Sequence, residues 1–159
     1  MRSPTQVAAL CAAVFVALAV VSKGSAAQFS RASEGRILGA MNQVRAANGL
    51  GPLRFDGKLH AAARAHSADM LRRGYFAHGA FSRRMSGFGV RAPVVGENLA
   101  WGTGDAAVAR TIVQEWLASP EHRANLLRPG FRLAGVGSAV GTFVGRTGAV
   151  VVTADFAGR

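Results

Sequence analysis

The sequence predicts an α+β fold, a single domain in which helices cover both faces of a small sheet as a three-layer α-β-α sandwich. Apolar residues recur at helical spacing in the first part of the chain, and strand-like patterns dominate the end. The final run, residues 150–156, is almost entirely apolar, which is typical of a strand covered on both faces. Helices first and strands last favour separate helical and sheet layers.

The first 27 residues have the pattern of a secretory signal peptide. Arg2 precedes an apolar run over residues 7–21, and small residues follow at residues 24–27. The run is shorter than the roughly 20 residues of a membrane span. We expect cleavage after Ala27, so residues 28–159 form the mature domain, secreted or periplasmic, with no transmembrane span.

The composition limits the classes of partner. The single cysteine, Cys11, lies in the leader, so the mature chain has no disulfides and depends on its core. The formal charge of +11 falls by two, to +9, when Arg2 and Lys23 are removed. Such a charge attracts anionic envelope polymers or membranes, or it is simply a soluble arginine-rich surface. No basic stretch is interleaved with aromatic residues, so nucleic acid is not an expected partner.

Two helices are predicted first. One covers residues 33–48, with an apolar stripe and the stop signal Asn48-Gly49. The second is capped by Asp56 and ends at Arg73-Gly74. His66 lies on its apolar face, where a hydrogen-bonded core histidine is expected, whereas His60 lies on its polar side and is expected to be solvated.

A long loop is predicted between Gly74 and Pro93, and it contains His78. Residues 94–101 are then predicted to form a short strand or extended segment in which Glu97 stands between apolar residues. A carboxylate in that setting needs a partner if it is buried.

A third helix is predicted from the Asp105 cap to about Ala118. With Val108 as the reference for its inward face, Glu115 lies about 20° away and leans inward beside Trp116. Glu115 is therefore either a member of a site or a rim carboxylate paired with an arginine.

Ser119-Pro120 predicts the start of another helix, with serine as the N-cap and proline at the first helical position. His122 lies in the first turn, where the helix dipole disfavours imidazolium. A neutral imidazole on a rigid element suits a metal ligand or a general base. The alternative is a surface helix that carries a histidine by chance.

The end of the chain predicts strands over residues 133–140, 142–144 and 150–156, with a turn at residues 145–148. The residues with chemical capacity are then His78, Glu97, Glu115 and His122, on four separate elements. They suit either a divalent metal such as zinc or an acid–base pair without metal. No two of them share a ligand motif that would prove convergence.

Seven short motifs occur in order between residues 37 and 156: Asn42-x-x-Arg45, Pro52-Leu53, Ala63-x-x-His66-x-x-Asp69-Met70, Gly74-Tyr75-Phe76-x-His78, Gly96-Glu97-Asn98, Trp116-x-x-Ser119-Pro120-x-His122-Arg123-x-Asn125 and Gly135-Val136-Gly137. In this order they resemble bacterial CAP-domain (SCP-like) proteins. That superfamily also includes cysteine-rich secretory proteins, antigen 5 and plant pathogenesis-related proteins.

The resemblance implies an α-β-α sandwich with a central cleft. It also implies that His78, Glu97 and His122 match three members of the family's tetrad of two histidines and two glutamates. The second glutamate of the eukaryotic pattern corresponds to Ser119, and Glu115, one turn earlier on the same helix face, is the candidate substitute. The disulfides of the animal members are missing.

Two functions remain open, and the sequence does not decide whether the protein is an enzyme. The first is an exported binding module that recognises an envelope component, a lipid, an anionic envelope polymer or a partner protein through the His/Glu cleft and the basic surface. The second is a metal-dependent hydrolase built on His78, Glu97 and His122. The binding module is favoured, because no serine lies in a nucleophile-elbow setting and no cysteine pairs with a histidine.

Overall fold

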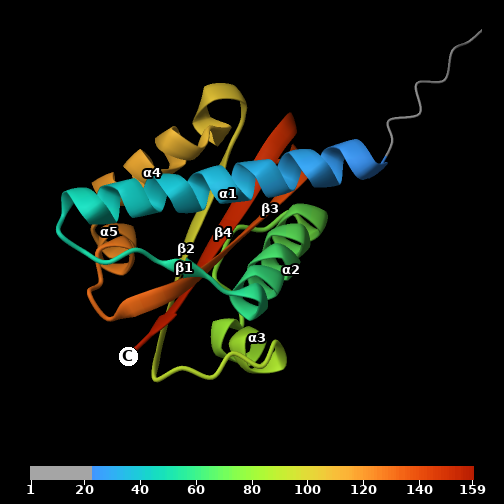
Figure 1. The fold of residues 1–159 in the computed structure, drawn as a ribbon. Helices are drawn as coiled ribbons and strands as arrows, with labels where there is room; N and C mark the ends of the chain where they lie inside the picture. The colour runs from blue at the N-terminus through green and yellow to red at the C-terminus, as the bar shows by residue number, and fades with distance from the viewer. Residues whose placement is uncertain (1–22) are drawn as a thin grey trace, which may run out of the picture.

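The structure is a computed structural model that describes residues 23–159 and, in helix α1, the side chains from residue 33 onward. The predicted leader lies outside the described residues, except for residues 23–27 at the start of α1. The elements in chain order are α1 (Lys23–Ala47), β1 (Arg54–Phe55), α2 (Gly57–Arg73), α3 (Phe81–Gly87), β2 (Val94–Gly102), the 3-10 helix η1 (Gly104–Ala107), α4 (Ala109–Ala118), α5 (Pro120–Leu126), β3 (Phe131–Phe143) and β4 (Arg146–Gly158) (Figure 1). Within residues 23–159, no helix has the length and apolar character needed to cross a membrane.

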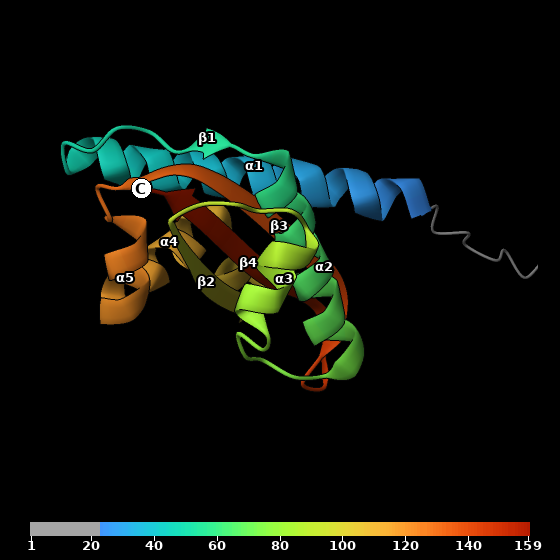
Figure 2. The same ribbon diagram turned by 90° about the horizontal axis from the view of Figure 1, so that it is seen from below.

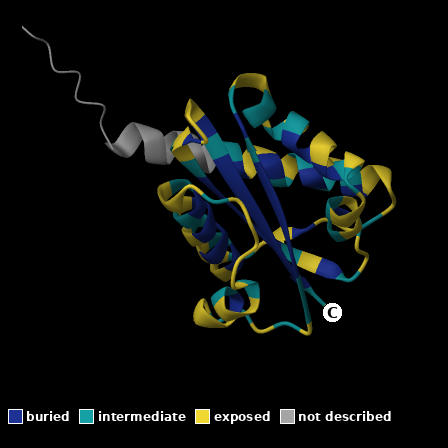
Figure 3. Cartoon of the chain, turned by 180° about the vertical axis from the view of Figure 1, so that it is seen from behind, coloured by how far each residue is buried: buried dark blue, intermediate teal, exposed yellow. Residues whose placement is uncertain are grey.

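The four strands form one sheet in the order β1-β3-β4-β2. β1 runs parallel to β3, and the pairs β3–β4 and β4–β2 are antiparallel. Residues 151–157 of β4 are all buried between neighbouring strands and the two helical layers (Figure 3). The prediction of a strand covered on both faces is confirmed, because β4 is an inner strand.

Helices pack on both faces of the sheet, as predicted. Ile37 of α1, Trp116 of α4 and Leu126 of α5 belong to one buried cluster with Val152 and Ala154 of β4. On the other face, α2 and α3 bury apolar side chains in two smaller clusters that include Val151 and Ala157 of the same strand. Alternate residues of β4 therefore pack against opposite helical layers. Figure 2 shows α2 and α3 on the other side of the strands from α4 and α5.

Two glycines let α2 lie directly against β3. A Cβ at Gly135 would overlap the backbone nitrogen of His60, and one at Gly137 would overlap that of Arg64. The hydroxyl of Ser67 donates to the Gly137 carbonyl at 3.0 Å. This close approach is the physical reason for the motif Gly135-Val136-Gly137, and it fixes the helix that carries His66.

The predicted boundaries hold best where capping groups define them. Asp56 accepts hydrogen bonds from the amides of Lys58 and Leu59, and Gly74 ends α2 with a φ of 67°. Residues 131–143 and 146–158 form a hairpin whose turn residues, Val144 and Gly145, have φ values of 48° and 73°. The turn therefore lies earlier than the predicted residues 145–148, because two positive-φ residues suffice to join the strands.

Three other boundaries were wrong. The first helix begins at Lys23 rather than residue 33. The predicted loop before Pro93 contains the seven-residue helix α3, whose Met85 is buried against α2. The helix expected from Asp105 to Ala118 is divided into η1 and α4, which begins at Ala109.

Candidate functional site

The site is centred on Glu97, a buried carboxylate in the outer strand β2. Its side chain is 2% exposed and faces the layer of α2 and α3. Oε1 accepts a hydrogen bond from His78 Nδ1 at 2.7 Å, and Oε2 accepts one from Arg84 Nη2. The expectation that a buried Glu97 needs a partner is confirmed, and both of its oxygens are engaged.

Arg84 comes from α3 and links three parts of the site. Besides its bond to Glu97, its Nη1 donates to the backbone carbonyl of His78 at 3.2 Å. Its Nε is buried without a hydrogen-bond partner among the described residues. Sequence reasoning missed Arg84, because an arginine in an expected loop gave no signal that a helix would bring it to Glu97.

His66 supports the same cluster from α2. It is 3% exposed, and its Nε2 donates to the Ala77 carbonyl at 3.0 Å, which fixes the segment that carries His78. Burial lowers the pKa of His66, and the Glu97 carboxylate, with its Oε2 3.9 Å from the same nitrogen, opposes that shift. The prediction of a hydrogen-bonded core histidine is confirmed.

Asp155 is a second buried carboxyl group beside Glu97. The two residues are direct partners across the pair β2–β4, and Asp155 is 0% exposed. Burial raises the pKa of Asp155 to about 9, with a further contribution from the negative charge of Glu97. A side-chain hydrogen bond with Glu97 raises this pKa as well. Asp155 is therefore a neutral acid at pH 7, and it was missed because it lies in an apolar run.

His122 approaches β2 from the opposite side, on α5. Ser119 is the N-cap residue and Pro120 the first helical residue, as predicted, although the serine side chain makes no capping bond. Burial lowers the pKa of His122, and the charge of His78 lowers it further, whereas Glu121 opposes the shift. The neutral imidazole is as expected, but burial rather than the helix terminus is its main cause.

A polar clamp holds α5 against β2. Asn98 Nδ2 donates to the His122 carbonyl at 2.9 Å, and Asn125 Nδ2 donates to Asn98 Oδ1 at 3.0 Å and to the Glu97 carbonyl at 3.1 Å. A Cβ at Gly96 would lie 2.8 Å from Asn125 Oδ1, so the helix could not approach as closely. The motifs Gly96-Glu97-Asn98 and His122-Arg123-x-Asn125 therefore form one structural unit that positions His122.

A small pocket of about 230 Å³ lies at this strand edge, lined by His122 and Glu115 with Phe76, Leu99, Ala100, Trp101 and Trp116. Consecutive β2 residues line it although their side chains point to opposite faces, so the pocket follows the edge of the sheet. His78 and Glu97 lie on one side of this edge strand and His122 on the other.

Glu115 lines that pocket but is exposed, so the prediction that it leans inward was wrong. The reference residue Val108 is 50% exposed and precedes α4. The buried stripe is Ile112, Val113 and Trp116, and Glu115 lies about 100° from its centre at 100° per residue. Glu115 is a rim residue in this arrangement.

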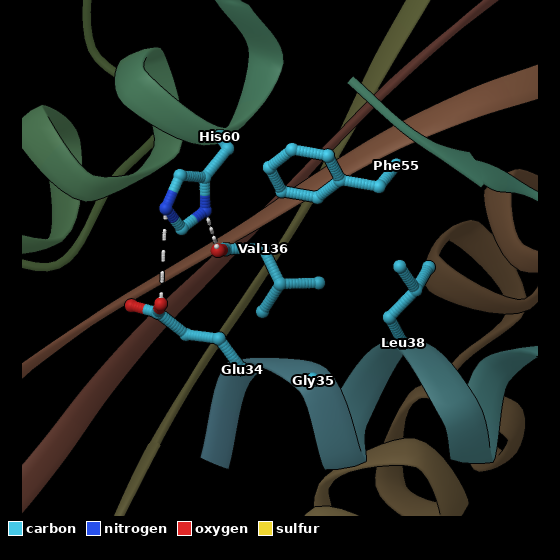
Figure 4. A pocket seen from close by; sticks show the side chains of 6 residues that line it. All are labelled: Glu34, Gly35, Leu38, Phe55, His60 and Val136. Atoms are coloured by element: carbon cyan, nitrogen blue, oxygen red, sulfur yellow. Dashed lines mark hydrogen bonds and ion pairs between the residues drawn. The ribbon is translucent and has the colours of Figure 1, made fainter. Parts of the chain in front are cut away.

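His60 was expected to be solvated, and this was also wrong. Its Nδ1 donates to the Val136 carbonyl at 2.7 Å, and its Nε2 lies 3.9 Å from Glu34 Oε2 (Figure 4). It lines a separate pocket of about 360 Å³ between α1, β1 and α2, with Leu38 and Phe55 as apolar walls. The close packing of α2 on β3 brings the polar side of the helix onto a strand carbonyl.

Contacts within the protein engage part of the predicted ligand set. Among residues 23–159, no three histidine, cysteine, aspartate or glutamate side chains are grouped as a metal would require. Both oxygens of Glu97 are already bonded to nitrogen donors, and Arg84 places a positive charge against one of them. A cation at Glu97 would have to displace these donors, and the ligand set His78, Glu97, His122 and Glu115 stays a prediction.

Comparison with known proteins identifies related chains. A family profile described as "CAP: Cysteine-rich secretory protein family" matches residues 38–156. The uncharacterized protein YkwD of Bacillus subtilis is 36% identical over 111 residues, which is 67% of this chain and 42% of YkwD. The uncharacterized membrane protein YlbC of the same bacterium is 34% identical over 66% of this chain and 31% of its own length. The chain thus spans less than half of these relatives.

Solved structures show the same fold. An extracellular protein containing an SCP domain from Bacillus anthracis matches with a TM-score of 0.74 and 26% identity, covering 87% of this chain and 44% of that one. An outer surface protein of Borrelia burgdorferi matches with a TM-score of 0.69 and 17% identity, over 81% of this chain and 94% of that one. The second match supports the fold alone.

Proposed function

The chain belongs to the CAP family of cysteine-rich secretory proteins, and from this premise we propose that it is an exported binding module for a cell-envelope component. The predicted leader supports export, as does the likeness to a protein described as extracellular. The cleft at β2 and the basic surface provide the recognition.

The observation that carries this proposal is the arrangement at the edge of β2. His122, whose backbone carbonyl is held by Asn98, lines a small pocket with aromatic walls. The hydrogen-bonded pair His78–Glu97 lies on the other side of the same edge strand. Such a site holds a small ligand group by a few oriented polar contacts and apolar packing. No cysteine is present in residues 28–159, and no serine lines the pocket, so no thiol or serine hydroxyl nucleophile accompanies these groups.

We expect the purified protein to co-sediment with isolated envelope material, and His122→Ala to weaken that binding at least about fivefold by removing one polar contact. Gln114→Ala is the control, because Gln114 is exposed on α4 and does not line the pocket. Thermal melting of each variant checks folding. Unchanged binding by folded His122→Ala protein would exclude the cleft as the recognition site.

The alternative is a metal-dependent hydrolase, which one observation favours: burial and His78 lower the pKa of His122, so its imidazole is in the neutral form that ligates metals. If this alternative is correct, zinc raises the melting temperature of the wild type but not of His78→Ala or His122→Ala. The rise in melting temperature caused by zinc then becomes smaller as the pH falls through about 6, where histidines take up protons. An equal zinc response in wild type and His122→Ala contradicts the hydrolase, and Glu115→Gln tests the fourth ligand.

A further inference from the structure

Four arginines line a pocket at one end of the sheet. Parallel strands begin at the same end, so Arg54 at the start of β1 lies near Arg132 at the start of β3. β4 ends there, followed by Arg159, and β2 begins there, preceded by Arg91. The pocket has a volume of about 540 Å³ and shares no lining residue with the cleft.

The positive charge of this arginine pocket is not neutralised by side chains. No aspartate or glutamate lines it, and all four arginines are exposed. Within residues 23–159, none of the four makes an ion pair, whereas Arg72 and Arg73 pair with Asp69, and Arg84 pairs with Glu97. The guanidinium groups of Arg54 and Arg91 have no hydrogen-bond partner in the described part of the chain, so they are available to a ligand.

The buried guanidinium of Arg45 adds a further positive charge next to Arg132. Arg45 is 0% exposed, and its partners within the described residues are backbone carbonyls rather than carboxylates. The Phe131 carbonyl accepts from Arg45 Nη2 at 3.2 Å and from Arg132 Nη1 at 3.3 Å, so the two like charges share one oxygen. Burial, together with the charge of Arg132, lowers the pKa of Arg45. A bound anion would offset this repulsion.

We propose that the arginine pocket binds phosphate groups of a soluble anionic envelope polymer. Phosphate offers several charged oxygens, so one group can bridge more than one guanidinium fork. The pocket is concave and has no aromatic lining residue, which favours a polymer chain over a membrane surface, where apolar side chains would insert. This inference rests on the proposed function, because it names the chemistry and the place of recognition of the envelope component.

The test is titration with soluble linear polyphosphate at several salt concentrations. The variant Arg54→Gln/Arg91→Gln is compared with Arg110→Gln/Arg146→Gln, which removes the same charge from exposed arginines outside the pocket. We expect the pocket variant to bind at least about tenfold more weakly and the control less than about twofold. Equal losses would show that the charge acts diffusely, and they would overturn the proposal.

Three further outcomes distinguish this inference from the proposed function and the polymer from a membrane. If wild-type protein fails to bind polyphosphate but still binds envelope material through His122, the proposal for the arginine pocket is overturned and the proposed function of the cleft stands. Binding only to vesicles that contain phosphatidylglycerol, with the same dependence on Arg54 and Arg91, overturns the assignment of a soluble polymer as the ligand and indicates a membrane surface instead. Polyphosphate binding through the pocket without any envelope binding supports the pocket and contradicts the proposed function.

Discussion

Replacing Arg84 with methionine is expected to lower the free energy of unfolding by about 3 kcal/mol. The Arg84 side chain is 11% exposed, and its partner Glu97 is 2% exposed, so the change leaves a buried carboxylate without its cationic partner. The effect falls at the lower end of the range for buried pairs, because the buried Nε of Arg84 has no partner to lose. Urea unfolding at pH 7 measures it.

The neighbouring residue provides the control. Arg83 is exposed on the same helix and makes no ion pair within residues 23–159, so Arg83→Met is expected to stay within about 0.5 kcal/mol of wild type. Adding Glu97→Gln to Arg84→Met removes the uncompensated charge and restores about 1 kcal/mol or more. If the double variant were no more stable than Arg84→Met, the buried charge would not be the cause.

Replacing Asp155 with asparagine is expected to change how stability depends on pH. The pKa of Asp155 is about 9 in the folded chain against an ordinary value of 3.8, so the native state retains a proton that the unfolded state releases. The contribution of Asp155 to the free energy of unfolding is fully present below pH 4. It is lost as the pH rises toward 9, by at most about 1.4 kcal/mol per pH unit. Asp155→Asn removes this loss and is expected to be more stable than wild type by about 1–3 kcal/mol at pH 8.

The difference between wild type and variant isolates this group, since other titrating groups contribute to both. Asp105→Asn, which changes an exposed carboxylate in η1, controls for the loss of one acidic residue. Unfolding at several pH values between 4 and 9 provides the measurement. A constant difference between wild type and Asp155→Asn over that range would show that Asp155 is ionised in the folded protein.

The sequence by itself determined the features that depend on neighbours along the chain. Asp56 and Gly74 set the ends of α2, because capping is a local hydrogen-bonding and φ requirement. The apolar run in β4 identified a strand covered twice, and the order of motifs identified His78, Glu97 and His122 as candidates on separate elements. The three-layer architecture followed from these signals.

Only the tertiary structure decided which partners these residues have. Arg84 reaches Glu97 because α3 packs against α2, and Asp155 lies beside Glu97 because of the register of β2 on β4. His60 bonds a strand carbonyl because glycines let α2 approach β3, although its helix position indicates solvent. A pattern along one element records which face is apolar, but it does not record the polar atoms that another element brings to that face, and those atoms determine burial, charge and pKa.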